Sequence, residues 1–291
     1  MLDDEEPTPT AGDRPEPTTY DDWHRVARDQ RVPTDPERPW LPPPRPAPPS
    51  GWTTRLLVEY DGSDFVGWAK QPGKRSVEAE FERVLTQILG ECPRIIVGGR
   101  TDTGVHASGQ IVAYDAEALA PYNLNALLPK DIAVLESTPA RPGFDPRNEA
   151  IGRTYRYRVL TRRERSVHRR STTLHFGRPL DLPAMQACAA ALVGNHDFRA
   201  FTPTETLHTW FRRTVTEASW TPAGDELHFT VTADSFLRHM NRSLVGTMLD
   251  VGLGARRVED FVSLLPGAPR KHAGWTAPSA GLSLERIDYP G

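Results

Sequence analysis

Hydrophobic residues follow two different spacings from residue 53 onward, so both strands and helices are predicted. Alternation of apolar and polar positions is typical of half-buried strands, and apolar stripes at intervals of three and four are typical of amphipathic helices. Strands are expected at 53–60, 94–97, 110–114, 133–137, 154–160, 214–220, 226–233 and 282–289. Helices are expected at 76–89, 181–192, 237–251 and 258–265. Strand-rich and helix-rich pieces mixed in this way predict an α+β fold with sheets covered by helices.

Polar residues indicate where two of these helices begin and where two strands turn. Ser76 and Asp181 stand at the starts of the first two predicted helices, where a short polar side chain caps the free N–H groups of the first turn. Gly194 follows the end of the second helix. The segment TPAGD at 221–225 predicts a hairpin turn between the strands at 214–220 and 226–233.

The first 50 residues show almost none of this periodicity. They hold 13 of the 28 prolines and an excess of acidic over basic side chains. We therefore predict a disordered or polyproline tail at 1–50. A short helical turn or docking segment at 20–27 is an alternative within it, and a solvated tail is preferred.

Composition excludes several classes of protein. The 291 residues are 38% hydrophobic and 25% charged, with a formal net charge of −3, as in ordinary globular chains of one large or two small domains. No apolar window approaches the roughly 18 residues of a spanning helix, and the start is acidic, so we predict a cytoplasmic protein without a membrane segment. The two cysteines, Cys92 and Cys188, lack metal-ligand or disulfide spacing, and both are predicted to be buried.

The most unusual stretch is GGRTDTGVHA at 98–107, between two predicted strands. Its glycines permit tight turns that present Arg100 and Asp102 from a rigid loop into a cleft. The alternative is an Asx-type turn, with Asp102 bonded to local backbone and Arg100 solvated, and spacing alone favours that alternative. His106 is either a general base or, more commonly, a histidine that satisfies local backbone groups.

A second candidate is the strand at 153–159. Alternation places Tyr155 and Tyr157 on one face and Arg156 and Arg158 on the other. Rings beside arginines suit stacking on unpaired bases and binding of phosphates. A half-buried strand with one apolar and one charged face explains the pattern equally well.

A third candidate is the predicted helix that begins near residue 237. Arg238 and Arg242 are four residues apart and share one face of that helix. Such a pair grips phosphates or orients a carboxylate such as Asp102. A solvated cationic face is the simpler interpretation.

Taken together and in order, these segments resemble the TruA-type tRNA pseudouridine synthases. The resemblance runs from about residue 55 to 290, and its most specific segment is GRTDTGVHA. The matching segments are YDGSDFVGW (60–68), RSVEAEFERVL (75–85), GGRTDTGVHASGQ (98–110), LPKDIAV (128–134), GRTYRYRV (152–159), DFRAF (197–201), FLRHMNRSLVGTMLDVG (236–252) and APSAGLSLERIDYP (277–290). Two departures are the missing second aromatic in FVGWAKQ and an arginine, Arg238, where the family frequently has histidine.

The resemblance implies a role for particular residues. Asp102 matches the catalytic aspartate, Arg100 the arginine of the same loop, and Tyr155 the active-site tyrosine that stacks on the uracil or accepts a proton. Arg242 and Leu284 match substrate-binding positions, and His106 and Arg238 are added as candidate substrate contacts. No metal and no cofactor are expected, because the isomerisation is redox-neutral.

The resemblance also implies a substrate, an assembly and a fold. The expected reaction converts uridine to pseudouridine at positions 38, 39 and 40 of the tRNA anticodon stem-loop, with Asp102 as nucleophile at C1′ or C6, or in removal of the 2′ proton. The expected assembly is a homodimer of chains with two ferredoxin-like halves, a catalytic half at 51–150 and a half at 151–291 that completes a central RNA-binding cleft. Alternatives are a synthase for another RNA or position, and a non-catalytic tRNA-binding protein.

Overall fold

The computed structural model describes residues 44–206 and 209–290. The helical turn considered at 20–27 and most of the predicted tail lie outside the described residues. Residues 44–50 of that tail are ordered: Arg45 forms hydrogen bonds of 2.5 and 2.8 Å with Asp115, and only 7% of its side chain is exposed. The folded part therefore begins at least seven residues before the predicted boundary.

The described residues contain ten strands and five α-helices. The strands are β1 (Thr53–Tyr60), β2 (Ile95–Val97), β3 (His106–Tyr114), β4 (Ile132–Ala140), β5 (Gly152–Leu160), β6 (Leu174–His175), β7 (Gly194–Asp197), β8 (Arg212–Ala223), β9 (Glu226–Ala233) and β10 (Leu282–Asp288). The helices are α2 (Val77–Leu89), α3 (Pro121–Asn125), α4 (Leu182–Ala191), α5 (Met240–Gly252) and α6 (Val258–Val262).

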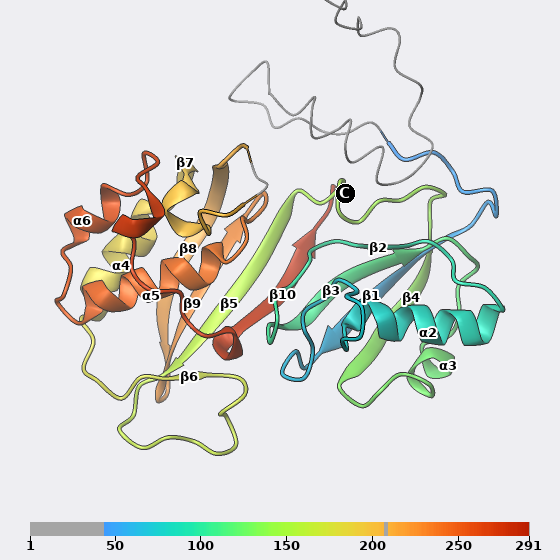
Figure 1. Cartoon of the computed structure of the whole chain (residues 1–291), viewed down its shortest axis with the longest axis horizontal. Helices are drawn as coiled ribbons and strands as arrows, with labels where there is room; N and C mark the ends of the chain where they lie inside the picture. Colours follow the sequence, from blue (N-terminus) through green and yellow to red (C-terminus); the bar gives the residue numbers. More distant parts are fainter. Residues whose placement is uncertain (1–43, 207–208, 291) are drawn as a thin grey trace, which may run out of the picture. The chain divides into compact units, whose positions relative to one another are not determined.

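All of these described strands belong to one mixed sheet in the order β4-β1-β3-β10-β5-β9-β8-β7, with β2 paired to β3 and β6 paired to β5 (Figure 1). In Figure 1, α2 and α5 lie in front of the strands, and α3 packs on β4 and α4 on β8. The α+β class with a mixed, mainly antiparallel sheet is confirmed. The division into two ferredoxin-like halves at 51–150 and 151–291 stays a prediction.

The middle of the sheet brings distant segments of the chain together. Strands β3 and β10 run parallel and pair over only two positions, Ser283 with His106 and Leu284 with Ala107. On its other edge, β10 pairs antiparallel with β5, so Leu284 lies opposite Tyr155. The loop that precedes β3 is thereby placed at the centre of the sheet, beside the strand that carries Tyr155.

The helix caps behave as the polar pattern predicts. The Ser76 hydroxyl accepts a hydrogen bond from the backbone N–H of Ala79 at 3.4 Å, and the Asp181 carboxylate accepts one from Ala184 at 3.0 Å. The apolar stripe of α2 is buried, and Phe81 stacks on Trp68 with ring centroids 6.0 Å apart. Burial of this stripe fixes α2 against the N-terminal strands.

Several local predictions are corrected. The helix expected at 237–251 begins only at Met240, because His239 has a left-handed backbone with φ 61°. The first hairpin strand is longer than expected, since β8 runs from Arg212 to Ala223 and leaves a two-residue turn of Gly224 and Asp225 before β9. Cys188 is buried as expected, whereas Cys92 is exposed. Strand β7 and helix α3 were not predicted, since four or five residues carry too little periodicity.

Among the described residues, no helix combines the length and apolarity that crossing a bilayer requires.

Candidate functional site

Hydrogen bonds from β3 and β1 fix the start of the loop at 98–105. The Gln110 side chain donates to the Gly99 carbonyl at 2.6 Å and accepts from the Gly99 N–H at 3.2 Å. The hydroxyls of Tyr60 and Thr101 are 2.8 Å apart, and Thr101 is buried. Gln110 itself is fully buried, so these contacts are well shielded from water. The loop backbone is therefore rigid up to the residue before Asp102.

The segment at 60–68 supports the same loop from a second side. The N–H of Trp68 donates to the Thr101 carbonyl at 3.1 Å, and the N–H of Gly104 donates to Phe65 at 3.2 Å. Gly67 has φ +97°, and a Cβ placed on it would lie 2.6 Å from the Thr101 oxygen. Only glycine allows both that backbone angle and that close approach. The motif YDGSDFVGW thus packs against and supports the loop at 98–105, named here the aspartate loop.

The Asp102 carboxylate points away from its own loop. Its Oδ2 lies 3.7 Å from His239 Nε2 and 3.9 Å from Arg242 Nη1, both on a segment more than 130 positions later in the chain. About a third of the side chain, 31%, is exposed. Within the described residues it accepts no hydrogen bond from local backbone, so the Asx-turn alternative is wrong for Asp102, although Arg100 is exposed as that alternative expected. The carboxylate is accessible and lies in a positive environment.

Arg242 is held by a reciprocal contact with Ala277. Its Nε donates to the Ala277 carbonyl at 2.7 Å, and the Ala277 N–H donates to the Arg242 carbonyl at 3.0 Å. Gly246, one turn later, permits this approach, because a Cβ there would lie 2.0 Å from the Trp275 oxygen. The bond from Nε to Ala277 therefore fixes the orientation of the guanidinium, and Nη1 faces Asp102. The interpretation in which Arg242 orients the aspartate is supported by this geometry.

His239 is a site residue that the sequence analysis missed. Among the described residues it is the one non-glycine residue with positive φ, a conformation that often marks functional sites. Burial is the main cause that lowers its pKa below the ordinary value, and Arg242, Arg238 and Arg270 lower it further while Asp102 opposes them. The imidazole is thus neutral at neutral pH. The pattern HMNR places it directly before the helix, but nothing in the pattern shows its backbone conformation.

Tyr155 lies on β5 beside the aspartate loop. Its ring packs edge-on against Phe236 with centroids 5.0 Å apart, and buried Leu284 lies opposite it on β10. The hydroxyl is close to Gly99, since a Cβ there would be 3.7 Å from it. Burial raises the pKa of Tyr155 far above its ordinary value, so the phenol is neutral. Among the described residues no hydrogen-bond partner holds its hydroxyl.

Arg153 connects the two sides of the site and was also missed. This buried arginine donates to the carbonyls of Gly98, at 3.1 Å, and Asp234, at 2.6 Å. It also donates to the carbonyls of Arg147 and Ala150. Burial lowers its pKa from the ordinary value. Gly98 starts the aspartate loop and Asp234 precedes the segment with His239 and Arg242, so Arg153 sets the spacing between them.

Three predicted site residues do not join this cluster. Arg100 is exposed and has no ion pair or hydrogen bond with any described residue. Arg238 is also exposed, and it precedes α5, so the predicted helical face shared with Arg242 is wrong. Both nitrogens of buried His106 are used: Nδ1 accepts from the Gly62 N–H at 3.1 Å and also lies 3.1 Å from the Asp61 carboxylate, and Nε2 donates to the Ser171 carbonyl at 2.7 Å. His106 therefore binds backbone groups as expected, but those of distant segments rather than local ones.

The two faces of β5 separate as the alternation predicts. Tyr157 is fully buried and its hydroxyl donates to the Pro278 carbonyl at 2.7 Å. Arg156 and Arg158 lie on the other face, 3.1 and 3.7 Å from Glu285. These arginines are partly neutralised by a carboxylate, and only Tyr155 of the four reaches the site.

No cluster of three or more His, Cys, Asp or Glu side chains in the described ranges is arranged to hold a metal ion.

Comparison with known proteins gives consistent results. The family described as tRNA pseudouridine synthase matches residues 188–290. The tRNA pseudouridine synthase A of Myxococcus xanthus is 40% identical over 241 residues, which is 81% of this chain and 91% of that protein. Those of Halalkalibacterium halodurans and Bacillus subtilis are 42% and 39% identical, covering 78% and 81% of this chain and 89% and 98% of theirs.

Among solved structures, a chain of "Crystal Structure of a Cbf5-Nop10-Gar1 Complex" aligns over 80% of this chain and 57% of its own length. Its TM-score of 0.33 and sequence identity of 14% are too low to define the fold.

Proposed function

The chain belongs to the tRNA pseudouridine synthase A family, and on this premise we propose that Asp102 is the nucleophile that isomerises uridine in the tRNA anticodon stem-loop. As a tRNA pseudouridine synthase the chain is an isomerase. The observation that carries the assignment of Asp102 is its accessible carboxylate, free of local backbone bonds and facing Arg242 and His239.

The reaction explains why a carboxylate beside an arginine is sufficient. The C1′–N1 bond of uridine breaks, the uracil turns and a C1′–C5 bond forms. The hydrogen on C5 leaves as a proton and the freed N1 takes up a proton, so the product is an isomer of uridine. No electrons are gained or lost. Asp102 attacks C1′ or C6, or removes the 2′ proton, and each route needs the ionised carboxylate. The guanidinium nearby attracts the negative carboxylate and remains charged throughout the reaction.

The other site residues have separate proposed roles. Tyr155 acts as a neutral phenol, because burial raises its pKa, and its unpartnered hydroxyl is available to the uracil. Leu284 forms the apolar floor beside it. Arg100 and Arg238 are exposed and are proposed to contact RNA. His106 is left out of the substrate contacts, since Gly62 and Ser171 occupy its nitrogens.

The finer statements about substrate and assembly are part of the same proposal. The target uridines are those at positions 38, 39 and 40, which must leave their stack to reach Asp102. The enzyme works as a cytoplasmic homodimer, with halves at 51–150 and 151–291 that flank the RNA-binding cleft. The sequence resemblance supports these statements, and light scattering of the purified chain measures the oligomeric state.

The test uses tRNA transcripts labelled with tritium at uridine C5, because forming the C1′–C5 bond must release that hydrogen. We expect release by the wild type, mapped to positions 38–40, and none by Asp102→Asn, which should still fold and bind tRNA. Asp260→Asn is the matched control, since Asp260 is 43% exposed and pairs with Arg257 on α6. Turnover by Asp102→Asn would falsify the nucleophile assignment. Release that maps elsewhere overturns the anticodon substrate, and tight binding without release by the wild type favours the binding-protein alternative.

A further inference from the structure

The connection between β5 and β6 is an arginine-rich loop outside the site described above. Residues 161–173, TRRERSVHRRSTT, are named here the arginine loop. It contains Arg162, Arg163, Arg165, Arg169 and Arg170, and its acidic residue is Glu164. A run of like charges repels itself, so such a loop keeps one conformation only where something anchors it.

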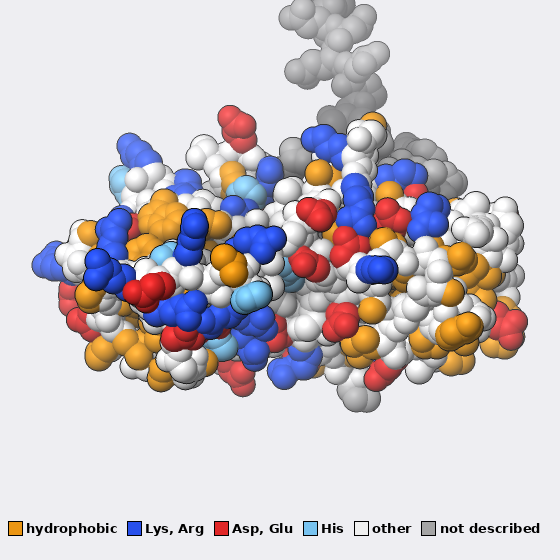
Figure 2. Space-filling model, turned by 90° about the horizontal axis from the view of Figure 1, so that it is seen from below, with side chains coloured by type: hydrophobic (Ala, Val, Ile, Leu, Met, Phe, Trp, Pro, Cys, Tyr) orange, Lys and Arg blue, Asp and Glu red, His pale blue; other side chains and the backbone are white. Residues whose placement is uncertain are grey.

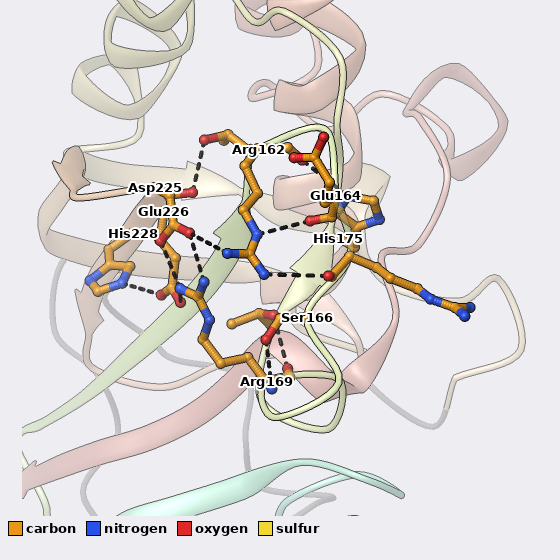
Figure 3. A network of polar contacts seen from close by, with 11 residues as sticks. Arg162, Glu164, Ser166, Arg169, His175, Asp225, Glu226 and His228 are labelled. Atoms are coloured by element: carbon orange, nitrogen blue, oxygen red, sulfur yellow. Dashed lines mark hydrogen bonds and ion pairs between the residues drawn. The ribbon is translucent and has the colours of Figure 1, made fainter.

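Arg169 provides that anchor. It forms a two-pronged ion pair with Asp225, with both N···O distances 2.7 Å, and a further contact of 2.6 Å with Glu226 (Figure 3). Glu226 also bonds His228 at 2.9 Å, and Arg162 lies 3.5 Å from Asp225. Asp225 belongs to the turn of the β8–β9 hairpin, and Glu226 is the first residue of β9. The hairpin turn thus fastens one side of the loop by planar, bidentate contacts, which are the most directional of ion pairs.

The arginine loop is also bound to the catalytic part of the molecule. The Ser171 carbonyl accepts the hydrogen bond from His106 Nε2 at 2.7 Å. His106 begins β3, four residues after Asp102. Arg169 and Ser171 thus hold the C-terminal end of the loop, next to β3, and Thr161 holds its other end by donating from its N–H and its hydroxyl to the Asp225 carbonyl, both at 2.9 Å.

Other arginines of the loop are not used to hold it. Arg163 and Arg165 are exposed, and their guanidinium groups have no hydrogen bond or ion pair with any described residue; the Arg165 carbonyl accepts a hydrogen bond from Arg162 at 3.3 Å. Arg170 is exposed and its guanidinium donates only to the Val167 carbonyl within the described chain, at 2.7 Å. Figure 2 looks at the molecule from below the view of Figure 1, the side on which this loop lies, and shows Lys and Arg side chains gathered over one half of that face.

A hollow beside the loop extends this surface. The cavity, about 390 Å³, is lined by Arg163, Arg178, Leu180, Leu182 and other residues between β5 and α4. A guanidinium matches the geometry of a phosphate, and it also stacks on an unpaired base. Two arginines among the lining residues of a partly apolar hollow therefore suit a nucleotide of an RNA strand.

We propose that the arginine loop is a phosphate-binding element that holds the tRNA backbone beside the active site. Arg163, Arg165 and Arg170 contact phosphates, and Arg169, clamped by Asp225 and Glu226, positions the loop. The proposal rests on tRNA as the substrate, and it assigns a binding role to residues outside the catalytic cluster. The loop acts on substrate affinity and leaves the chemical step unchanged.

The first experiment compares two double variants that lose the same charge. Arg163→Gln/Arg165→Gln removes the proposed contacts, and Arg83→Gln/Arg257→Gln removes two exposed, ion-paired arginines, one on α2 and one directly before α6. We expect the first variant to raise KM for tRNA about tenfold, with kcat changed less than about twofold, and to lower the salt dependence of binding by about one counterion per lost contact. The control should keep both values. Equal effects in the two variants, or an unchanged KM in the first, overturn the proposal.

The second experiment tests whether the arginine loop must be held in place by Asp225, or whether its positive charge alone attracts tRNA. Asp225→Asn removes a negative charge, so charge alone predicts tighter tRNA binding and a lower KM. If Asp225 anchors the loop through Arg169, the variant instead has a higher KM with kcat retained. A lower KM overturns the anchoring role. Wild-type tritium release is measured in the same series, so that failure of the loop proposal is distinguished from failure of the anticodon assignment.

Discussion

Two aspartate and arginine pairs in this molecule differ in how closely they are joined. Asp225 is held by Arg169 at 2.7 Å through both of its oxygens. Asp102 lies 3.9 Å from Arg242, beyond hydrogen-bond distance, although the two side chains face each other. The same residue types thus form a closed pair in one place and an open one in the other.

The difference teaches how a carboxylate is kept available. Hydrogen bonds from Arg169 are the main cause that lowers the pKa of Asp225 to about 2, and they occupy the lone pairs that a reaction would need. In the open pair, Arg242 donates its Nε–H to the Ala277 carbonyl and makes no hydrogen bond to Asp102, so the carboxylate oxygens stay available to a substrate. The closed pair of Asp225 and Arg169 has a structural role, and the open pair of Asp102 and Arg242 leaves a carboxylate available for catalysis.

The largest expected effect comes from shortening the arginine of the open pair. Arg242→Lys removes the Nε contact with Ala277 and withdraws positive charge from Asp102, so we expect kcat to fall by about 10³-fold. Single-turnover tritium release measures this. Arg169→Lys in the closed pair should leave kcat near the wild-type value. A comparable loss of kcat in both variants would contradict the distinction between the pairs.

A third pair, Arg45 with Asp115, tests what a buried closed pair contributes. Their side chains are 7% and 11% exposed, so Arg45→Met leaves a buried charge without a partner and should cost about 3 kcal/mol of unfolding free energy. Urea denaturation measures it. For the same reason, deletion of residues 1–50 should destabilise the protein, whereas deletion of 1–43 should preserve both stability and turnover. Equal stability of the two truncations would show that the Arg45 pair contributes little.

Removing the Tyr155 hydroxyl separates catalysis from packing. Because no described residue bonds that hydroxyl, Tyr155→Phe should change the unfolding free energy by less than about 0.5 kcal/mol. We expect kcat to fall by about 10²-fold, since the hydroxyl is free to act on the uracil. Full activity of the Phe variant would limit Tyr155 to stacking.

The smallest expected effects concern His239 and its left-handed backbone. His239→Ala should cost about 1 kcal/mol of unfolding free energy, because alanine is strained at φ 61°, whereas His239→Gly and His239→Asn should cost less. Thermal denaturation compares them.

The lowered pKa of His239 also predicts a dependence of stability on pH. The unfolded imidazole, with a pKa near about 6.5, binds protons more readily than the folded one, so the folded state loses stability as pH falls through that value. His239→Asn should lose less Tm between pH 7.5 and 5.5 than the wild type. An identical loss of Tm in both proteins would contradict a lowered pKa.

Local patterns predicted much of the fold. The strands at 53–60 and 226–233 match β1 and β9, and the caps at Ser76 and Asp181 form as expected, because alternation and capping depend on neighbours in the chain. The start of α5 was wrong for the opposite reason. His239 has its left-handed backbone angle beside Asp102 and Arg242, and these tertiary contacts do not show in the hydrophobic periodicity of the sequence.

The candidate site shows the same division. Asp102, Tyr155, Leu284 and Arg242 were identified from their motifs and resemblance, and the structure places them together. His106 is different: its motif suggests chemistry, but Ser171, 65 positions away, occupies its Nε2. Likewise Arg153 and Gln110 lie within recognised motifs, but the motifs do not indicate that these side chains bind the carbonyl groups of Gly98 and Gly99.

The sequence by itself determined the α+β class and most of the strands and helices, since these follow from periodicity, and the resemblance of its motifs identified the family and the aspartate loop. Only the tertiary structure decided which arginine faces Asp102, that His239 lies beside it, and that Arg169 is bound to Asp225 and Glu226. The physical reason is that ion pairs and hydrogen bonds act over a few ångströms, and the partners are brought within that range by β3–β10–β5 and β8–β9 pairing. Chain position alone does not record those distances.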